Sequence, residues 1–153
     1  SLAAGSMLPY VSRAVNRNKW SVFLCDPNGR MSNGRRAFSD HHLLFVYDVY
    51  IKPYLYDEAQ GKGIKNVYVV CHSAAGIALT RLLHDRESVL PCIAGIAGTD
   101  TDFGRAKTEK VKQVMKERVI NFRCSYEPKD KVLSEKDEFP KRVSAGHHEH
   151  IYS

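Results

Sequence analysis

The chain lacks the patterns that define several large protein classes. In its 153 residues no apolar run reaches the roughly 20 residues that a helix needs to span a bilayer. The first residues have neither the basic start nor the apolar centre of a signal peptide. Internal repeats and low-complexity segments are also missing. These absences predict one globular domain over residues 1–153 that does not bind membranes.

Paired cysteines are absent too. None of the four cysteines forms a C-x-x-C pair, which argues against a structural zinc site. Each lies in or beside an apolar, β-like run, where a small buried hydrophobic residue fits: Cys25, Cys71, Cys92 and Cys124. These features favour a reduced, intracellular protein without a disulfide framework. No metal or other cofactor is predicted.

The charge of the chain is moderate. Its net charge is +6 at pH 7, with 43% apolar and 26% charged residues, which are globular values. Basic residues concentrate in two stretches, 30–36 and 107–118. Aromatic residues do not interleave with them, so they indicate solvated surfaces, and nucleic-acid binding is not expected.

Strands and helices alternate along most of the chain. The predicted strands are Trp20–Cys25, Asn66–Cys71, Cys92–Ala97 and Val119–Cys124, with a possible short one at Arg142–Ser144. The predicted helices are Pro9–Val15, a run from Asp40 that Pro53 kinks or ends, Ala74–Arg86 and Arg105–Lys116. Asp26–Ser39 is predicted to be an exposed loop. Because the strands are apolar throughout, the pattern predicts an α/β fold: a doubly wound, mainly parallel sheet covered on both faces.

The most informative stretch is Val67–Gly76. A β-branched apolar run breaks into small residues around Ser73, and an apolar-periodic helix follows. That order is typical of a nucleophile elbow, in which a serine hydroxyl stands exposed above a sheet. Cys71 and Ala75 occupy the positions of the two glycines in G-x-S-x-G, so the motif is degenerate. The alternative is an ordinary βα turn in which Ser73 caps the helix.

A nucleophilic serine needs a base and a group that orients the base, in the chain order Ser, acid, His. Asp100 and Asp130 each follow a predicted strand, and each could instead be a loop acid that caps a turn. The candidate bases are His147, His148 and His150 in the H-H-E-H run. Adjacent histidines on a short tail do not readily face one metal ion. His72, next to the serine, is predicted to be a buried structural residue.

Five short runs, taken in order, resemble one family. They are Pro9–Val15, Asp26–Asn28, Asn66–Ser73, Ser125–Asp130, and Val143–Gly146 followed by His148-Glu149. Together they resemble the Arb domain family, which includes the argonaute-binding subunit of the fission-yeast argonaute–siRNA chaperone complex and animal cotranscriptional regulators. The resemblance implies an α/β-hydrolase-like fold, nuclear or cytoplasmic location, and argonaute or chromatin-associated partners.

The resemblance also implies roles for single residues. An A-H-S-x-G-G elbow matches Cys71 to Gly76, which places the nucleophile at Ser73. The acid falls on Asp130, and the base on His148 because it precedes a glutamate. Asp100, His147 and His150 stay open as alternatives. In this fold the backbone N–H after the nucleophile, that of Ala74, is one oxyanion donor.

One departure from the family has consequences. Family members carry an H-G-S-G-like segment upstream of the Pro9 helix, which provides a second oxyanion donor, and this chain begins after that point. We therefore expect a partial domain in which Trp20–Cys25 pairs directly with Asn66–Cys71. A strand formed by Ser1–Leu8 in that position would overturn this expectation.

Two functions follow from these observations. The first is a serine hydrolase of esterase or acyl-transfer type acting on a small ester or acyl substrate, weak or inactive without the second donor. The second is a non-catalytic interaction module in RNA-silencing or chromatin assemblies.

Overall fold

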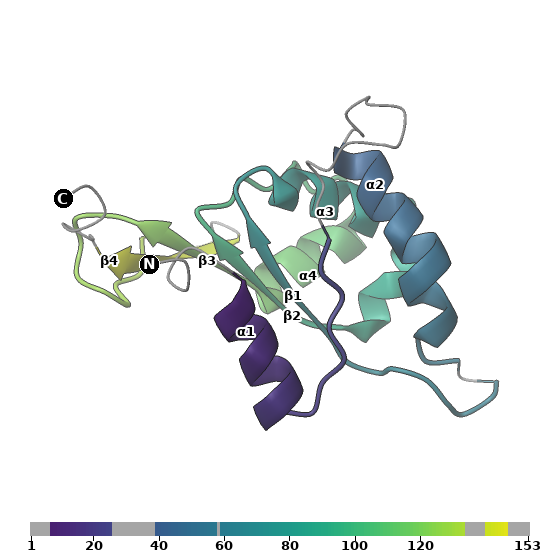
Figure 1. Cartoon of the computed structure of the whole chain (residues 1–153). Coiled ribbons are helices and arrows are strands. Elements are labelled where there is room, and N and C mark those ends of the chain that lie inside the picture. Colours follow the sequence, from purple (N-terminus) through teal and green to yellow (C-terminus); the bar gives the residue numbers. More distant parts are fainter. Residues whose placement is uncertain (1–6, 26–38, 58, 134–139, 147–153) are drawn as a thin grey trace, which may run out of the picture.

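Four parallel strands form the centre of the molecule (Figure 1). The computed structural model describes residues 7–25, 39–57, 59–133 and 140–146. The strands are β1 (Val67–His72), β2 (Ile93–Thr99), β3 (Val119–Cys124) and β4 (Lys141–Gly146). They lie in the order β1-β2-β3-β4, and each neighbouring pair is parallel. The chain is therefore an α/β protein.

One face of the sheet carries the hydrophobic core. Cys71, Ile96 and Val119 are buried there, whereas Tyr68, Val70 and Ile120 are exposed on the opposite face. Successive residues of a strand point to opposite faces, and the register keeps the two sets apart, with Tyr68 beside Gly95 and Val70 beside Ala97. We call the face of Tyr68, Val70 and Ile120 the open face.

Three helical segments cover the core face. They are α2 (Ser39–Val46), which continues through η2 (Tyr47–Ile51), α3 (Ala75–Asp85) and α4 (Glu109–Arg118). Tyr47, Leu83 and Met115, one from each segment, are fully buried in the same cluster. The connection from α3 to β2 is a 3₁₀ segment, η4 (Glu87–Cys92). Packing of these apolar helix faces against β-branched strand residues accounts for the core.

The opposite side of the sheet is only partly covered. α1 (Leu8–Ser12) and η1 (Arg13–Arg17) lie across the sheet from α4 (Figure 1). Neither segment buries any of its residues. The prediction of a parallel sheet with helices is confirmed, but the predicted doubly wound arrangement, with both faces covered, is not met by the described residues.

Most predicted elements are confirmed. β1, β3 and α3 lie within one residue of their predicted bounds, β2 ends two residues later, and the possible short strand is a full strand, β4. The second helix ends in a 3₁₀ turn that contains Pro53, η3 (Lys52–Tyr54). The predicted loop Asp26–Ser39 lies outside the described residues apart from Ser39, which begins α2.

Helix α4 begins later than its predicted start at Arg105. Thr108 is its N-cap and accepts a hydrogen bond from the Val111 N–H at 3.4 Å. The preceding segment is tied to α3 instead, because Thr80 Oγ1 accepts from the Gly104 N–H and His84 Nε2 accepts from the Lys107 N–H, both at 3.2 Å. The N-cap at Thr108 and these two hydrogen bonds therefore determine where α4 begins, although the residues before Thr108 have a helical sequence pattern.

The predicted strand Trp20–Cys25 does not form, and its predicted pairing with β1 is wrong. No described residue pairs with Ser21–Cys25, and most of this segment is exposed. The Trp20 N–H instead donates to Ala14 O of η1 at 2.9 Å. A β-type sequence becomes a strand only where a partner edge satisfies its backbone groups. The Ser1–Leu8 strand that would have overturned the expectation is not seen among the described residues: Leu8 begins α1, and Ser1–Ser6 lie outside them.

All four cysteines are free thiols. Cys71 and Cys92 are buried as predicted, whereas Cys124 is exposed and that prediction is wrong. Within the described part of the chain, no helix is both long enough and apolar enough to traverse a bilayer.

The helical segment before β1 is fastened to the end of α3 by one ion pair. Arg86 Nε and Nη2 donate to the two Asp48 carboxylate oxygens at 2.8 and 2.7 Å. Hydrogen bonding to Arg86 lowers the pKa of Asp48 below its usual value. A carboxyl whose pKa is lower in the folded state stabilises the fold above its unfolded pKa, about 3.9. That stabilisation is lost as the pH falls through the lower folded pKa.

We therefore expect Asp48→Asn to lower the melting temperature at pH 7, with the difference from wild type shrinking below about pH 4. Circular dichroism melts between pH 2.5 and 7 measure this. Asp57→Asn is the control, because its amide oxygen can still accept from the Ala59 N–H as Asp57 Oδ1 does. A difference that stays constant over the whole pH range would contradict the role of the ion pair.

Candidate active site

Ser73 sits at a strained turn between β1 and α3. β1 ends at His72, and Ala74 is the N-cap of α3. Ser73 has a φ of 54°, in the left-handed region that residues other than glycine seldom adopt. Such a conformation costs about 1–3 kcal/mol, so the surroundings must impose it. The turn is the strand–turn–helix geometry that the sequence predicts.

The loop after β2 holds this turn on both sides of Ser73. The Ser73 N–H donates to Thr99 O at 3.4 Å, and the Asp102 N–H donates to Ser73 O at 3.2 Å. Thr101 Oγ1 donates to Cys71 O at 2.8 Å. Both backbone polar groups of Ser73 are therefore fixed, which explains how the positive φ persists.

A buried amide in turn holds this loop. Asn121 of β3 is 3% exposed and Thr101 is 1% exposed. Asn121 Nδ2 donates to Thr101 O at 2.7 Å, and the Thr101 N–H donates to Asn121 Oδ1 at 3.3 Å. Sequence reasoning missed both residues. The sequence feature that could have revealed Asn121 is its place as a polar residue on the core face of an otherwise apolar strand. A buried polar side chain of this kind must be hydrogen-bonded.

Gly76 lets the loop approach α3 closely. A Cβ at this position would overlap the Thr101 methyl group and lie 2.7 Å from Asp102 O. Only glycine fits there without displacing the loop. Gly76 therefore couples the first turn of α3 to the segment that fixes Ser73.

The N-terminus of α3 leaves one N–H group, that of Ala74, without an acceptor among the described residues. Helix α3 also has no side-chain cap there. Unpaired N–H groups and the positive end of the helix dipole favour a negative charge at this position. Ser73 therefore does not act as the cap that the alternative interpretation assigns to it.

The thiol beside this turn is not a competing nucleophile. Cys71 is buried, and this burial raises its pKa to about 11. Because the thiolate is the reactive form, Cys71 is inert at neutral pH.

The two candidate acids differ in what their carboxylates do. Asp100 has a φ of 46° directly after β2, and its Oδ1 accepts from the Cys124 N–H at 2.9 Å and lies 3.9 Å from Arg123 Nε. Asp100 thus acts as a loop acid that caps the end of β3. Asp130 also has a positive φ, 69°, and its N–H donates to Ser144 O at 2.8 Å.

The Asp130 carboxylate is exposed, and no described group donates a hydrogen bond to it. Its loop is pinned to β4, because Ser144 Oγ donates to Glu127 O at 2.7 Å. Of the two acids, Asp130 is the one whose carboxylate is available to a further partner.

The candidate bases His147, His148 and His150 lie outside the described residues. β4 ends at Gly146, which has a φ of 80°. All strands are parallel, so Ser73, Asp100, Asp130 and Gly146 lie toward the same edge of the sheet. β4 is three strands from β1, about 14 Å at the usual spacing. A base from this tail has to reach back across that edge to Ser73.

His72 differs from its prediction, because it is exposed and not buried. Its Nδ1 lies 2.6 Å from Thr99 O and 3.3 Å from Thr99 Oγ1. A carbonyl oxygen only accepts, so Nδ1 carries the proton. This bond turns the ring along the open face toward β2.

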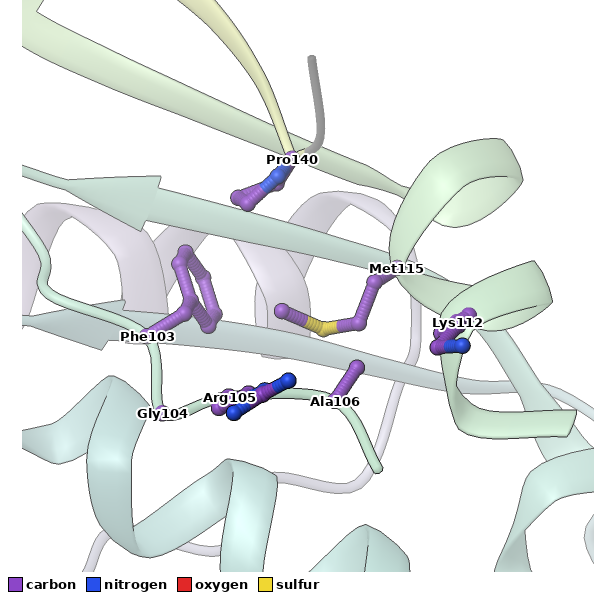
Figure 2. Close-up of a pocket in the computed structure, with 7 residues that line it drawn as sticks. All are labelled: Phe103, Gly104, Arg105, Ala106, Lys112, Met115 and Pro140. Atoms are coloured by element: carbon purple, nitrogen blue, oxygen red, sulfur yellow. The ribbon is translucent and has the colours of Figure 1, made fainter. Parts of the chain in front are cut away.

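Ser73 does not line either of two hollows on the described surface. One of about 370 Å³ lies between the 103–106 segment and α4, where Phe103, Met115 and Pro140 converge (Figure 2). The other, of about 440 Å³, lies on the open face beside Trp20, Tyr68 and Ile120.

No cluster of three potential metal ligands exists in the described part of the chain. No family model, curated protein or solved structure matches this chain. The geometry of the described residues therefore carries the functional argument.

Proposed function

We propose that this chain is an α/β-hydrolase-like domain of Arb type, in which Ser73 is the nucleophile of weak esterase or acyl-transfer chemistry. One observation carries the proposal: Ser73 is held at a φ of 54° between a parallel strand and a helix whose N-cap N–H, that of Ala74, has no acceptor among the described residues. Strain at a position that the surroundings over-determine is typical of functional sites.

The residues would divide the reaction as follows. Ser73 Oγ attacks the substrate carbonyl carbon while a histidine of the tail, His148 in the first instance, takes the hydroxyl proton. The Ala74 N–H donates to the resulting oxyanion. The tetrahedral adduct collapses, the leaving alcohol receives the proton, and water then hydrolyses the acyl-serine by the same steps. Asp130 orients the imidazole by accepting its other N–H.

Turnover is expected to be slow. Hydrolases of this fold use two oxyanion donors, and the Ala74 N–H is the donor that the described residues offer at Ser73. The loss of one donor lowers turnover by about 10²–10³.

Labelling by a fluorophosphonate probe tests the proposal. We expect slow, stoichiometric labelling of the wild type, none of Ser73→Ala, and wild-type labelling of Ser12→Ala, a remote exposed serine. Asp130→Asn and His148→Ala should each slow labelling at least tenfold, and Asp100→Asn should do so less. Equal labelling of wild type and Ser73→Ala would refute the proposal.

A second candidate function is favoured by the open face. It is a non-catalytic module that binds argonaute or chromatin-associated proteins through the exposed Tyr68, Val70 and Ile120. In that case Ser73→Ala leaves binding to purified argonaute unchanged, and Ile120→Lys weakens it. If Ser73→Ala weakened this binding and Ile120→Lys left it unchanged, the result would favour the serine chemistry.

A further inference from the structure

Ser144 of β4 is fully buried, and each of its polar groups has a partner. Its N–H donates to Lys131 O and its carbonyl oxygen accepts from the Asp130 N–H, both at 2.8 Å. Its hydroxyl donates to Glu127 O at 2.7 Å and accepts from the Gly146 N–H at 3.0 Å. This one residue therefore joins the loop that carries Asp130 to the end of β4.

The hydroxyl protons around Ser144 have one consistent arrangement. Ser144 Oγ lies 2.8 Å from Ser125 Oγ. A serine hydroxyl has a single proton, and that of Ser144 goes to Glu127 O, so the Ser125 hydroxyl donates to Ser144. Ser125 Oγ in turn accepts from the Glu127 N–H at 3.3 Å. The two hydroxyls thus fix both backbone polar groups of Glu127, three residues before Asp130.

The residues after Asp130 are fixed as well. They run antiparallel along the outer edge of β4, where the Leu133 N–H donates to Arg142 O at 2.9 Å. Together with the backbone bonds of Ser144, this pairing holds Asp130 from both sides at its φ of 69°. No described group donates a hydrogen bond to the Asp130 carboxylate. The backbone of this acid is therefore fixed while its carboxylate stays available.

We propose that Ser144 is a positioning residue for the acid of the proposed reaction. Its hydroxyl fixes the loop 127–131 and thereby sets where the Asp130 carboxylate meets the histidine that Ser73 needs. Misplacement of such a group by about 1 Å can cost about 10²-fold in rate. The same hydroxyl holds Gly146, which directly precedes the H-H-E-H run. This inference rests on the proposed function, because Ser144 acts through Asp130 and takes no part in the bond changes.

Threonine and valine at position 144 isolate the hydroxyl. The two side chains have nearly the same shape, so both variants share the cost of the added bulk, and only Ser144→Thr can donate to Glu127 O. We expect folded Ser144→Val to react with the fluorophosphonate probe at least tenfold more slowly than folded Ser144→Thr. Val114→Ala is the stability control, because Val114 is a buried residue of α4. It should lower the melting temperature and leave labelling of the folded protein unchanged.

A double-mutant cycle of Ser144→Ala and Asp130→Asn tests the route through the acid, and the smaller side chain adds no bulk. Each single variant should slow labelling at least tenfold. The double variant should match Asp130→Asn within twofold, because asparagine already lacks the carboxylate that Ser144 positions. A merely structural role predicts instead that the two effects multiply.

Amide hydrogen exchange measured by NMR separates this inference from the serine chemistry. Ser144→Ala removes the acceptor of the Gly146 N–H and the donor to Glu127 O. Exchange at the Asp130 and Gly146 amides should therefore quicken at least tenfold more than at the amides within α3. Unchanged exchange at both amides refutes the inference whether or not Ser73 reacts.

The labelling results decide the rest. Equal rates for Ser144→Val and Ser144→Thr, or a double variant slowed by the product of the two single effects, would refute the positioning role while the proposed function stands. Equal labelling of wild type and Ser73→Ala would refute the proposed function itself and leave Ser144 a structural residue only.

Discussion

Gly76→Ala is expected to destabilise the fold by about 3 kcal/mol and to abolish probe labelling of Ser73. The added Cβ would overlap the Thr101 methyl group and approach Asp102 O, and backbone cannot yield as a flexible side chain does. The loop that holds both backbone groups of Ser73 must move. Urea unfolding measures the free energy, and labelling of the folded variant measures the site.

A control and a rescue make this result specific. Gly95→Ala should be nearly neutral, because its Cβ would meet only the Tyr68 ring, at 3.5 Å or more. Thr101→Ser removes the overlapping methyl group and keeps the hydroxyl, so it should recover part of the loss in the double variant. Additive effects of Gly76→Ala and Thr101→Ser would contradict direct contact.

The parts of the fold that could be predicted from the sequence are those with local causes. β1 and β3 are β-branched runs bounded by turn residues, and the buried residues of α3 recur at helical spacing. The Trp20–Cys25 run has the same local pattern as β1, but its state depends on a partner edge that no local pattern reveals. The later start of α4 likewise depends on contacts of Thr80 and His84, which lie on another helix.

The site could be predicted in part for the same reason. Ser73 stands out because small residues and a strand–helix junction surround it in the sequence. Its left-handed backbone, and those of Asp100 and Asp130, are imposed by hydrogen bonds between strands that lie far apart in the chain. The exposure of His72 also follows from register, because His72 pairs with Thr99 on the face that the helices leave partly open.

Ser73, Asp100 and Asp130 share a left-handed backbone, and the cause of this conformation helps to assign their roles. Each has a positive φ in a turn at the carboxyl side of the sheet. Only Asp100 uses its carboxylate to cap a described backbone N–H, so its conformation has a structural cause. The Asp130 backbone is held by the bond from its N–H to Ser144 O, while its carboxylate accepts no hydrogen bond from a described group and can therefore take the role proposed for it.

Asn121→Ala is expected to cost about 2–3 kcal/mol and to weaken Ser73 reactivity at least tenfold. The amide satisfies the Thr101 N–H and donates to Thr101 O in a region that water does not reach. Its removal leaves the Thr101 N–H buried without an acceptor among the described residues, while Arg123 Nη1, 3.2 Å from Thr101 O, can still donate to that oxygen. The loop that carries the Asp102 N–H then loses its anchor, and the Ser73 turn can relax to a negative φ.

Two variants test whether these effects are specific to the hydrogen bonds around Thr101. Asn66→Ala removes an exposed amide directly before β1 and should change neither property. Thr101→Val keeps the shape of the side chain but removes the bond to Cys71 O, so it should destabilise the fold and slow labelling. Labelling of Asn121→Ala is measured at a temperature where the variant is fully folded. Wild-type labelling there would show that Asn121 stabilises the fold without positioning Ser73.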